Sequence, residues 1–92
     1  MRTEKSDIAL SLNGRDGGKC FLVIGTEDGY SLLADGKTRK ADRPKRKKNK
    51  HLRLVGKAEG PTAAKLLGGE KVTNNEIRRV LAQYAAREKG GM

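Results

Sequence analysis

The sequence predicts a mainly β protein: a small five-stranded β-barrel followed by one amphipathic α-helix. Three observations predict this fold. Short apolar or alternating stretches recur between residues 7 and 55, glycine-containing turns separate them, and a capped helical pattern begins at Thr73. Regularly spaced short strands are typical of small barrels, in which closure removes exposed strand edges. A chain of 92 residues has room for a single small domain with a modest core.

The strand pattern comes from alternation and from turn residues. Ile8, Leu10 and Leu12 alternate on one face of the first predicted strand, and a continuous apolar run forms the second. Asp-Gly pairs at 28–29 and 35–36 predict tight turns on either side of the third, because this dipeptide tolerates positive φ. The predicted strands cover residues 7–12, 20–25, 30–34, 38–41 and 51–55.

The C-terminal third has a different composition. Glycines and Pro61 mark residues 56–72 as a linker, with a short helix expected at 62–67. Thr73 and Glu76 have the spacing of a capping box, an apolar stripe follows them, and Gly90-Gly91 ends the pattern. The stripe residues are Ile77, Val80, Leu81, Tyr84 and Ala85. The stripe either covers the barrel or docks on a partner protein.

These patterns divide the chain into four parts. We expect a flexible N-terminus at residues 1–6, the barrel at 7–55 with a basic segment at 37–53, the linker at 56–72 and the helix at 73–89.

The basic segment is the strongest functional signal. It contains ten Lys or Arg residues and the single acid Asp42, so it carries +9 of the chain's formal +10. Each cation that docks on a phosphate releases condensed counterions, so a polyanion is the natural partner. The plainer interpretation, a solvated loop that aids solubility, explains such a concentration of charge poorly. Residues 44–48 also match the degenerate pattern of a nuclear localisation signal.

Other classes of function find little support in the sequence. The lone Cys20 lies in an apolar run and excludes an intrachain disulfide, so we expect a buried structural thiol rather than a reactive one. The loop at 14–19 lacks the Ser or Thr of a phosphate-binding nucleotide loop, and one histidine provides neither a metal cluster nor a catalytic triad. No apolar run is long enough for a membrane span. We therefore expect a cytoplasmic, non-enzymatic protein without cofactor or metal.

The order of motifs resembles a known family. An Asn13-Gly14-Arg15-Asp16-Gly17-Gly18-Lys19 turn comes before a hairpin, and Leu33-Ala34-Asp35-Gly36, Arg43-Pro44-Lys45-Arg46-Lys47 and Asn49-Lys50-His51-Leu52 follow. This succession is similar to the small KOW proteins of the archaeal and eukaryotic large ribosomal subunit and their stand-alone bacterial relatives. The likeness covers about residues 6–55. It implies an SH3-like barrel that binds RNA, usually ribosomal RNA, without catalysis.

The resemblance and the charge pattern together give the predicted site. Gly14, Gly17 and Gly18 form the KOW turn, where backbone amides could approach a phosphate. The predicted RNA-binding residues are Arg15, Lys19, Lys37, Arg39, Lys40, Arg43, Lys45, Arg46, Lys47, Lys48, Lys50, His51 and Arg53. His51 could equally be an ordinary half-exposed strand residue.

The kind of partner follows from composition. With only three aromatic residues, we expect recognition of a folded RNA by backbone and shape, with Tyr30 as the one ring able to stack on a base. The free protein should be a monomer. The alternative function is a protein–protein docking module of the transcription–translation apparatus, with ribosomal or transcription proteins as partners.

Overall fold

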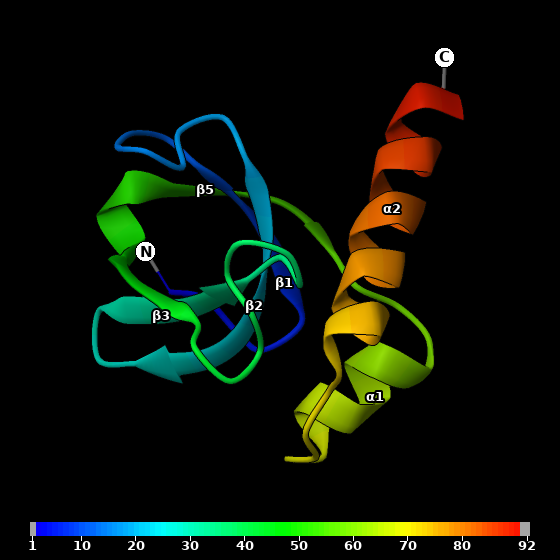
Figure 1. Ribbon diagram of the computed structural model, residues 1–92. Coiled ribbons are helices and arrows are strands. Elements are labelled where there is room, and N and C mark those ends of the chain that lie inside the picture. The colour runs from blue at the N-terminus through cyan, green and yellow to red at the C-terminus, as the bar shows by residue number, and fades with distance from the viewer. Residues whose placement is uncertain (1, 91–92) are drawn as a thin grey trace.

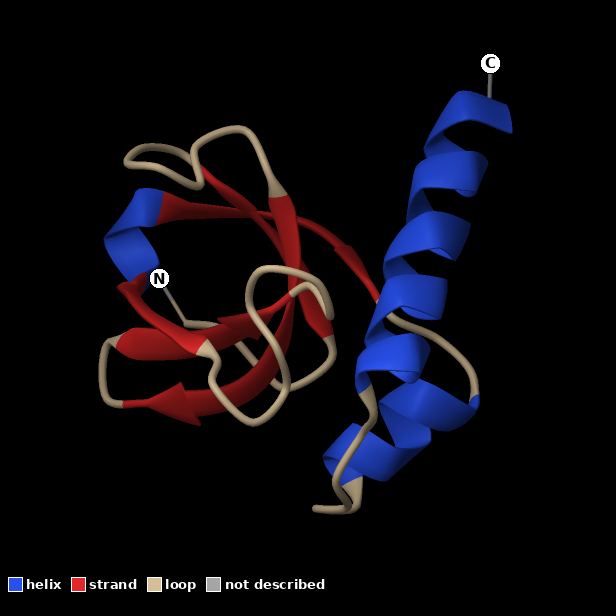
Figure 2. Ribbon diagram, in the orientation of Figure 1, coloured by secondary structure: helices blue, strands red, loops and turns tan. Residues whose placement is uncertain are grey.

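The computed structural model describes residues 2–90: a five-stranded antiparallel sheet with two helices against one face (Figures 1 and 2). The strand order is β4-β3-β2-β1-β5. The elements are β1 (Asp7–Ser11), β2 (Cys20–Glu27), β3 (Tyr30–Ala34), β4 (Lys45–Lys48), the 3-10 helix η1 (Asn49–His51), β5 (Leu52–Lys57), α1 (Pro61–Leu67) and α2 (Asn74–Gly90). The predicted mainly β class, the number of strands and the C-terminal helix are confirmed.

The sheet is strongly curved but open. β4 and β5 are its two edge strands, and within residues 2–90 no ladder pairs them with each other. The chain instead turns from one edge to the other through η1, where the Leu12 amide donates to the His51 carbonyl oxygen at 3.0 Å. Figure 1 shows this curvature around the N-terminal segment. The sheet does not close as the barrel that the sequence predicts.

The fourth strand lies later in the chain than predicted. Residues 38–41 form no strand, because the Asp35 carboxylate accepts hydrogen bonds from the Lys37 and Arg39 amides at 2.9 and 2.8 Å and from the Thr38 hydroxyl at 3.0 Å. Such local bonds favour a turn over a ladder. β4 forms instead from Lys45–Lys48, which pairs with β3 through the backbone. An edge strand of this kind needs no apolar residues, and its lysines discourage further pairing.

Two small cores lie on opposite faces of the sheet. The face covered by the helices contains Ile8, Leu22 and Ala34, with Ile77 and Val80 of α2 against them. The core of the other face consists of Ala9, Phe21, Val23, Leu33 and Leu52. Because both faces of β1 are covered at its start, Ile8 and Ala9 are both buried, while Leu12 is 51% exposed beyond the end of the strand. The predicted strand at 7–12 thus ends one residue early, and Leu12 does not share the buried face with Ile8.

The helical region follows the local sequence signals. α1 occupies the predicted linker and begins with Pro61. At the start of α2 the Glu76 amide donates to the Thr73 hydroxyl at 3.1 Å, and the Thr73 amide donates to the Glu76 carboxylate at 2.9 Å. This is the predicted capping box. α2 continues through Gly90, and Gly91 lies outside the described residues. Its buried stripe packs on the sheet.

The segment before β1 is packed against the sheet, although we expected residues 1–6 to be flexible. Thr3 and Ser6 are buried. The Ser6 amide donates to the Val23 carbonyl oxygen at 2.9 Å, and the Thr3 and Ser31 hydroxyls lie 2.6 Å apart. Met1 lies outside the described residues.

Candidate nucleic-acid interface

The glycine-rich loop between β1 and β2 is a compact, backbone-bonded turn. The Gly17 amide donates to the Gly14 carbonyl oxygen at 3.1 Å, and the Gly18 amide donates to the Ser11 carbonyl oxygen at 2.8 Å. Gly14 and Gly18 have φ of 80° and 85°, a region that other residues rarely adopt. The turn leaves Arg15 exposed at its tip. The three predicted glycines therefore shape this loop.

An ion pair fastens this loop to the loop between β3 and β4. The Arg39 guanidinium donates to the Asp16 carboxylate at 2.8 Å, and the Asp16 side chain is only 9% exposed. The Nε of Arg39 is buried and has no hydrogen-bond partner within the described residues. Arg39, a predicted RNA-binding residue, thus joins two loops that are distant in sequence.

The loop at residues 35–44 is also fastened to α2. The Ala41 amide donates to the Asn74 side chain at 2.8 Å, and Arg78 donates to the Gly36 carbonyl oxygen at 2.5 Å. Gly36 has φ of 79°, and a Cβ there would lie 2.5 Å from the Asn74 carbonyl oxygen. A glycine is therefore required where the loop meets the helix. The exposed cations of this loop are Lys37, Lys40 and Arg43.

The charge of Asp35 stabilises the same loop. Partial burial disfavours its carboxylate, but hydrogen bonds from the Lys37 and Arg39 amides and from Thr38 outweigh burial and lower the pKa of Asp35. The carboxylate stays ionised just before the basic segment, and its charge stabilises the turn.

The lysines and arginine of β4 divide between two faces. Lys45 and Lys47 lie opposite Leu33 and Ser31, and both are half-buried. The Lys47 ammonium donates to the Ser11 hydroxyl at 2.7 Å and to the Asn13 carbonyl oxygen at 2.8 Å. It therefore bridges β4 and the start of the glycine-rich loop. On the other face, Lys48 is exposed.

Arg46 shares that other face and has partners of its own. Its Nε donates to the Glu27 carboxylate at 2.5 Å, and its guanidinium carbon lies 3.6 Å from the centroid of the Tyr30 ring. The Glu27 hydrogen bond raises the pKa of Arg46. The one predicted stacking ring therefore already has a cation on its face.

η1 and β5 complete the basic surface. Lys50 and Arg53 are exposed, whereas His51 is half-buried. Nδ2 of Asn13 lies 3.1 Å from Nδ1 of His51. With the amide nitrogen as the donor, Nδ1 of His51 accepts this hydrogen bond. His51 thereby holds the beginning of the glycine-rich loop against η1.

A hollow lies between the start of β2, the 35–44 loop and α2. Its lining includes the cations Lys19, Lys37 and Arg78 and the apolar residues Cys20, Leu81 and Ala82. Arg78 lies outside the predicted basic segment, and only the docking of α2 reveals that it belongs with these cations.

Cys20 is half-buried, and burial raises the pKa of its thiol, which disfavours the reactive thiolate.

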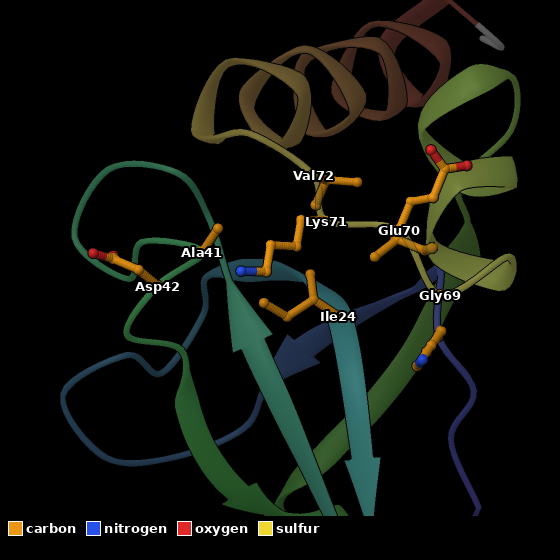
Figure 3. A pocket seen from close by; sticks show the side chains of 9 residues that line it. Ile24, Ala41, Asp42, Gly69, Glu70, Lys71 and Val72 are labelled. Atoms are coloured by element: carbon orange, nitrogen blue, oxygen red, sulfur yellow. The ribbon is translucent and has the colours of Figure 1, made fainter.

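A second hollow lies between the sheet and the segment that joins the helices (Figure 3). Ile24, Ala41, Leu66 and Val72 supply apolar surface, and charged side chains that include Asp42 surround it. Figure 3 shows Ile24 and Val72 on opposite sides of the hollow, with the Asp42 carboxylate directed away from it.

The described residues contain no group of three or more His, Cys, Asp or Glu that could hold a metal ion. Over the same part of the chain, no helix is long and apolar enough to cross a membrane. No protein-family model and no curated protein sequence matches this chain.

Proposed function

We propose that this is a non-catalytic, cytoplasmic RNA-binding protein of the KOW type, which contacts folded RNA, ribosomal RNA in particular, through its basic surface. One observation carries the proposal. The Asp16–Arg39 ion pair holds the glycine-rich loop and the 35–44 loop together, so their exposed cations form one surface that is already ordered before binding. Preorganisation of this kind reduces the entropy lost on binding.

The proposed contacts are mainly electrostatic. Besides Arg46, which is exposed but paired with Glu27, the exposed cations of the surface are Arg15, Lys19, Lys37, Lys40, Arg43, Lys48, Lys50 and Arg53. If about six phosphates are neutralised, the slope of log affinity against log salt should be about −4 to −5. In this proposal Arg39, Lys47 and His51 shape the surface through bonds within the chain, and Lys45 is half-buried opposite Leu33.

The aromatic residues support recognition by shape. Phe21 is fully buried, and the Tyr84 hydroxyl donates to the Val55 carbonyl oxygen at 3.2 Å beneath α2. Neither ring is placed to stack on a base. A protein that contacts phosphates without base stacking has little means of distinguishing sequences.

The proposed family also implies an SH3-like barrel. Five consecutive antiparallel strands, with the two edges brought together at η1, are compatible with a relative of that architecture. The proposal adds that the protein acts as a monomer and needs no cofactor.

The proposal can be tested by titrating a folded ribosomal RNA fragment at several salt concentrations. Replacing Lys37, Lys40 and Arg43 together by Gln should weaken binding about tenfold or more and make the salt slope shallower by about two. The matched control replaces Lys5, Lys71 and Arg79, which lie outside the basic loops, and removes the same charge. Equal losses in the two triple variants would mean that only net charge matters and would count against this interface.

The ribosomal part needs its own experiment. Sedimentation of the tagged protein through a sucrose gradient should show it with large ribosomal subunits at low salt and free after a high-salt wash. A protein that stays in the top fractions at low salt would refute the ribosomal assignment, whereas RNA binding in the titration would survive it.

A second candidate function is a protein–protein docking module, and the apolar hollow of Figure 3 favours it. An apolar side chain of a partner could enter between Ile24 and Val72, with Lys71 and Glu70 at the margin. A ribosomal or transcription protein that remains bound after nuclease treatment and is released by Ala41→Glu would support this function over RNA binding. Partner loss on nuclease treatment alone would favour the RNA proposal.

A further inference from the structure

Tyr30, Arg46 and Glu27 form a layered cluster at the β2–β3 hairpin. Tyr30 lies opposite Glu27 in the β2–β3 ladder, and Arg46 is on the neighbouring edge strand, opposite Leu32. The guanidinium carbon lies 3.6 Å from the centroid of the Tyr30 ring. Cross-strand neighbours on one face can make such contacts without distorting the backbone.

The cluster fixes the plane of the guanidinium group. One face rests on the tyrosine ring, and the Nε edge is tied to the Glu27 carboxylate at 2.5 Å. The Arg46 side chain is nevertheless 55% exposed. The Tyr30 ring covers one face of the guanidinium group, and Glu27 occupies its Nε edge. The opposite face and the edge formed by the two terminal nitrogens are therefore the parts left for a ligand.

Arg46 is poorly suited to be a simple phosphate contact. The Glu27 carboxylate already compensates its charge and occupies its Nε donor. What remains is a flat, oriented cationic surface, and such guanidinium planes stack on nucleobases in RNA-binding proteins. Lys48, directly opposite Tyr30 and exposed, is placed to hold an adjacent phosphate.

We propose that an unpaired nucleobase of the bound RNA stacks on the open face of Arg46, forming a Tyr30–Arg46–base sandwich. This inference rests on the proposed RNA-binding function and adds a ligand class, an extruded base, to an interface otherwise made of phosphate contacts. The base identity matters little, because every base has a flat π-face.

The test compares two RNA hairpins that differ in one nucleotide. Each contains a single-nucleotide bulge, which carries a base in one hairpin and is abasic in the other, so that the phosphates are the same. The wild-type protein should bind the hairpin with the base about fivefold or more tightly than the abasic one, as stacking on one base implies.

Arg46→Lys retains the positive charge but replaces the flat guanidinium group, on which a base could stack, by a compact ammonium group. This variant should bind both hairpins equally, with an affinity for the abasic hairpin within about twofold of wild type. Tyr30→Phe keeps the supporting ring and should keep the preference. Lys48→Gln should weaken binding to both hairpins alike. Thermal unfolding of each variant confirms that it is folded.

The outcomes separate the two proposals. A preference for the base that persists in Arg46→Lys, or is absent in a wild-type protein that binds both hairpins, overturns the stacking inference and leaves the RNA-binding function intact. Failure of the wild-type protein to bind either hairpin at low salt, or any folded ribosomal RNA, overturns both.

Discussion

The Lys47 ammonium lies 2.7 Å from the Ser11 hydroxyl and joins the edge strand β4 to the end of β1. The same ammonium donates to the Asn13 carbonyl oxygen, at the start of the glycine-rich loop. A cation in the most basic stretch of the chain therefore serves the fold, and the position of the loop depends on it. Cations of the basic segment consequently differ in what their removal should do.

Replacing Lys47 by Gln should destabilise the protein, whereas replacing Lys48 by Gln should not. The Lys47 variant loses two charge-assisted hydrogen bonds at a half-buried site, and we expect a loss of about 1–2 kcal/mol in unfolding free energy. The exposed Lys48 should change stability by less than about 0.5 kcal/mol while weakening RNA binding. Chemical denaturation monitored by circular dichroism measures the difference, and equal stabilities would contradict the structural role of Lys47.

Asp16→Asn should change RNA affinity in the direction opposite to the one that net charge alone predicts. Removing an acid should strengthen RNA binding if only net charge mattered. Because Asp16 holds Arg39 and thereby orders both loops, we expect affinity to fall by about three- to tenfold instead. Stability should fall by about 1 kcal/mol. Asp28→Asn, at an exposed hairpin tip, removes the same charge and should leave affinity unchanged or slightly higher. Tighter binding by Asp16→Asn would refute the ordering role.

Comparing Gly36→Ala with Gly29→Ala separates the stability cost of a left-handed backbone from the cost of a steric clash between a new Cβ and α2. Both glycines have positive φ, 79° and 75°, but only at Gly36 would a Cβ meet another atom, the Asn74 carbonyl oxygen at 2.5 Å. Gly29→Ala should cost about 1 kcal/mol for the left-handed backbone. Gly36→Ala should cost about 3 kcal/mol, because the loop must also move away from α2. Thermal melts of the two variants test this order, and similar melting temperatures would contradict the close approach.

The pH dependence of stability should include a contribution from Glu76. Its hydrogen bond to Lys65, at 2.7 Å, and then its bond from the Thr73 amide lower the pKa of Glu76 below its usual 4.5. A carboxyl with a depressed pKa in the folded state stabilises the protein above its unfolded pKa, and this stability is lost as the pH falls through the folded value. Melting temperatures should therefore fall as the pH drops below about 4.5. Glu76→Gln should start from a lower melting temperature at neutral pH and fall less. A parallel decline in both proteins would exclude this contribution.

Local chemistry explains what could be predicted from the sequence. The β2–β3 hairpin depends on its Asp-Gly turn, and the α2 N-terminus depends on Thr73 and Glu76, so short-range rules found both. β4 could not be predicted, since a charged edge strand pairs through its backbone and has no apolar pattern. Barrel closure was predicted, but within the described residues the edge strands β4 and β5 share no ladder, and η1 only turns the chain from one to the other.

In the candidate site, too, features set by local sequence could be predicted, and features set by tertiary contacts could not. The glycine-rich loop and the exposed lysines follow from composition. The sequence could not distinguish Lys48, which faces solvent, from Arg39, which pairs with an acid more than twenty positions away. Arg78 was missed because its place beside the loops arises only from helix packing. Charge runs thus locate a surface, while tertiary contacts decide which cations are available.

The neighbours Ile8 and Ala9 point into different cores, one beneath the helices and one on the opposite face. β1 therefore belongs to both cores, and we expect the two halves of the molecule to unfold together. Calorimetry should record a single transition whose calorimetric and van't Hoff enthalpies agree. In the cell, a fragment ending before α2 would then be a substrate for proteolysis rather than a smaller RNA-binding unit.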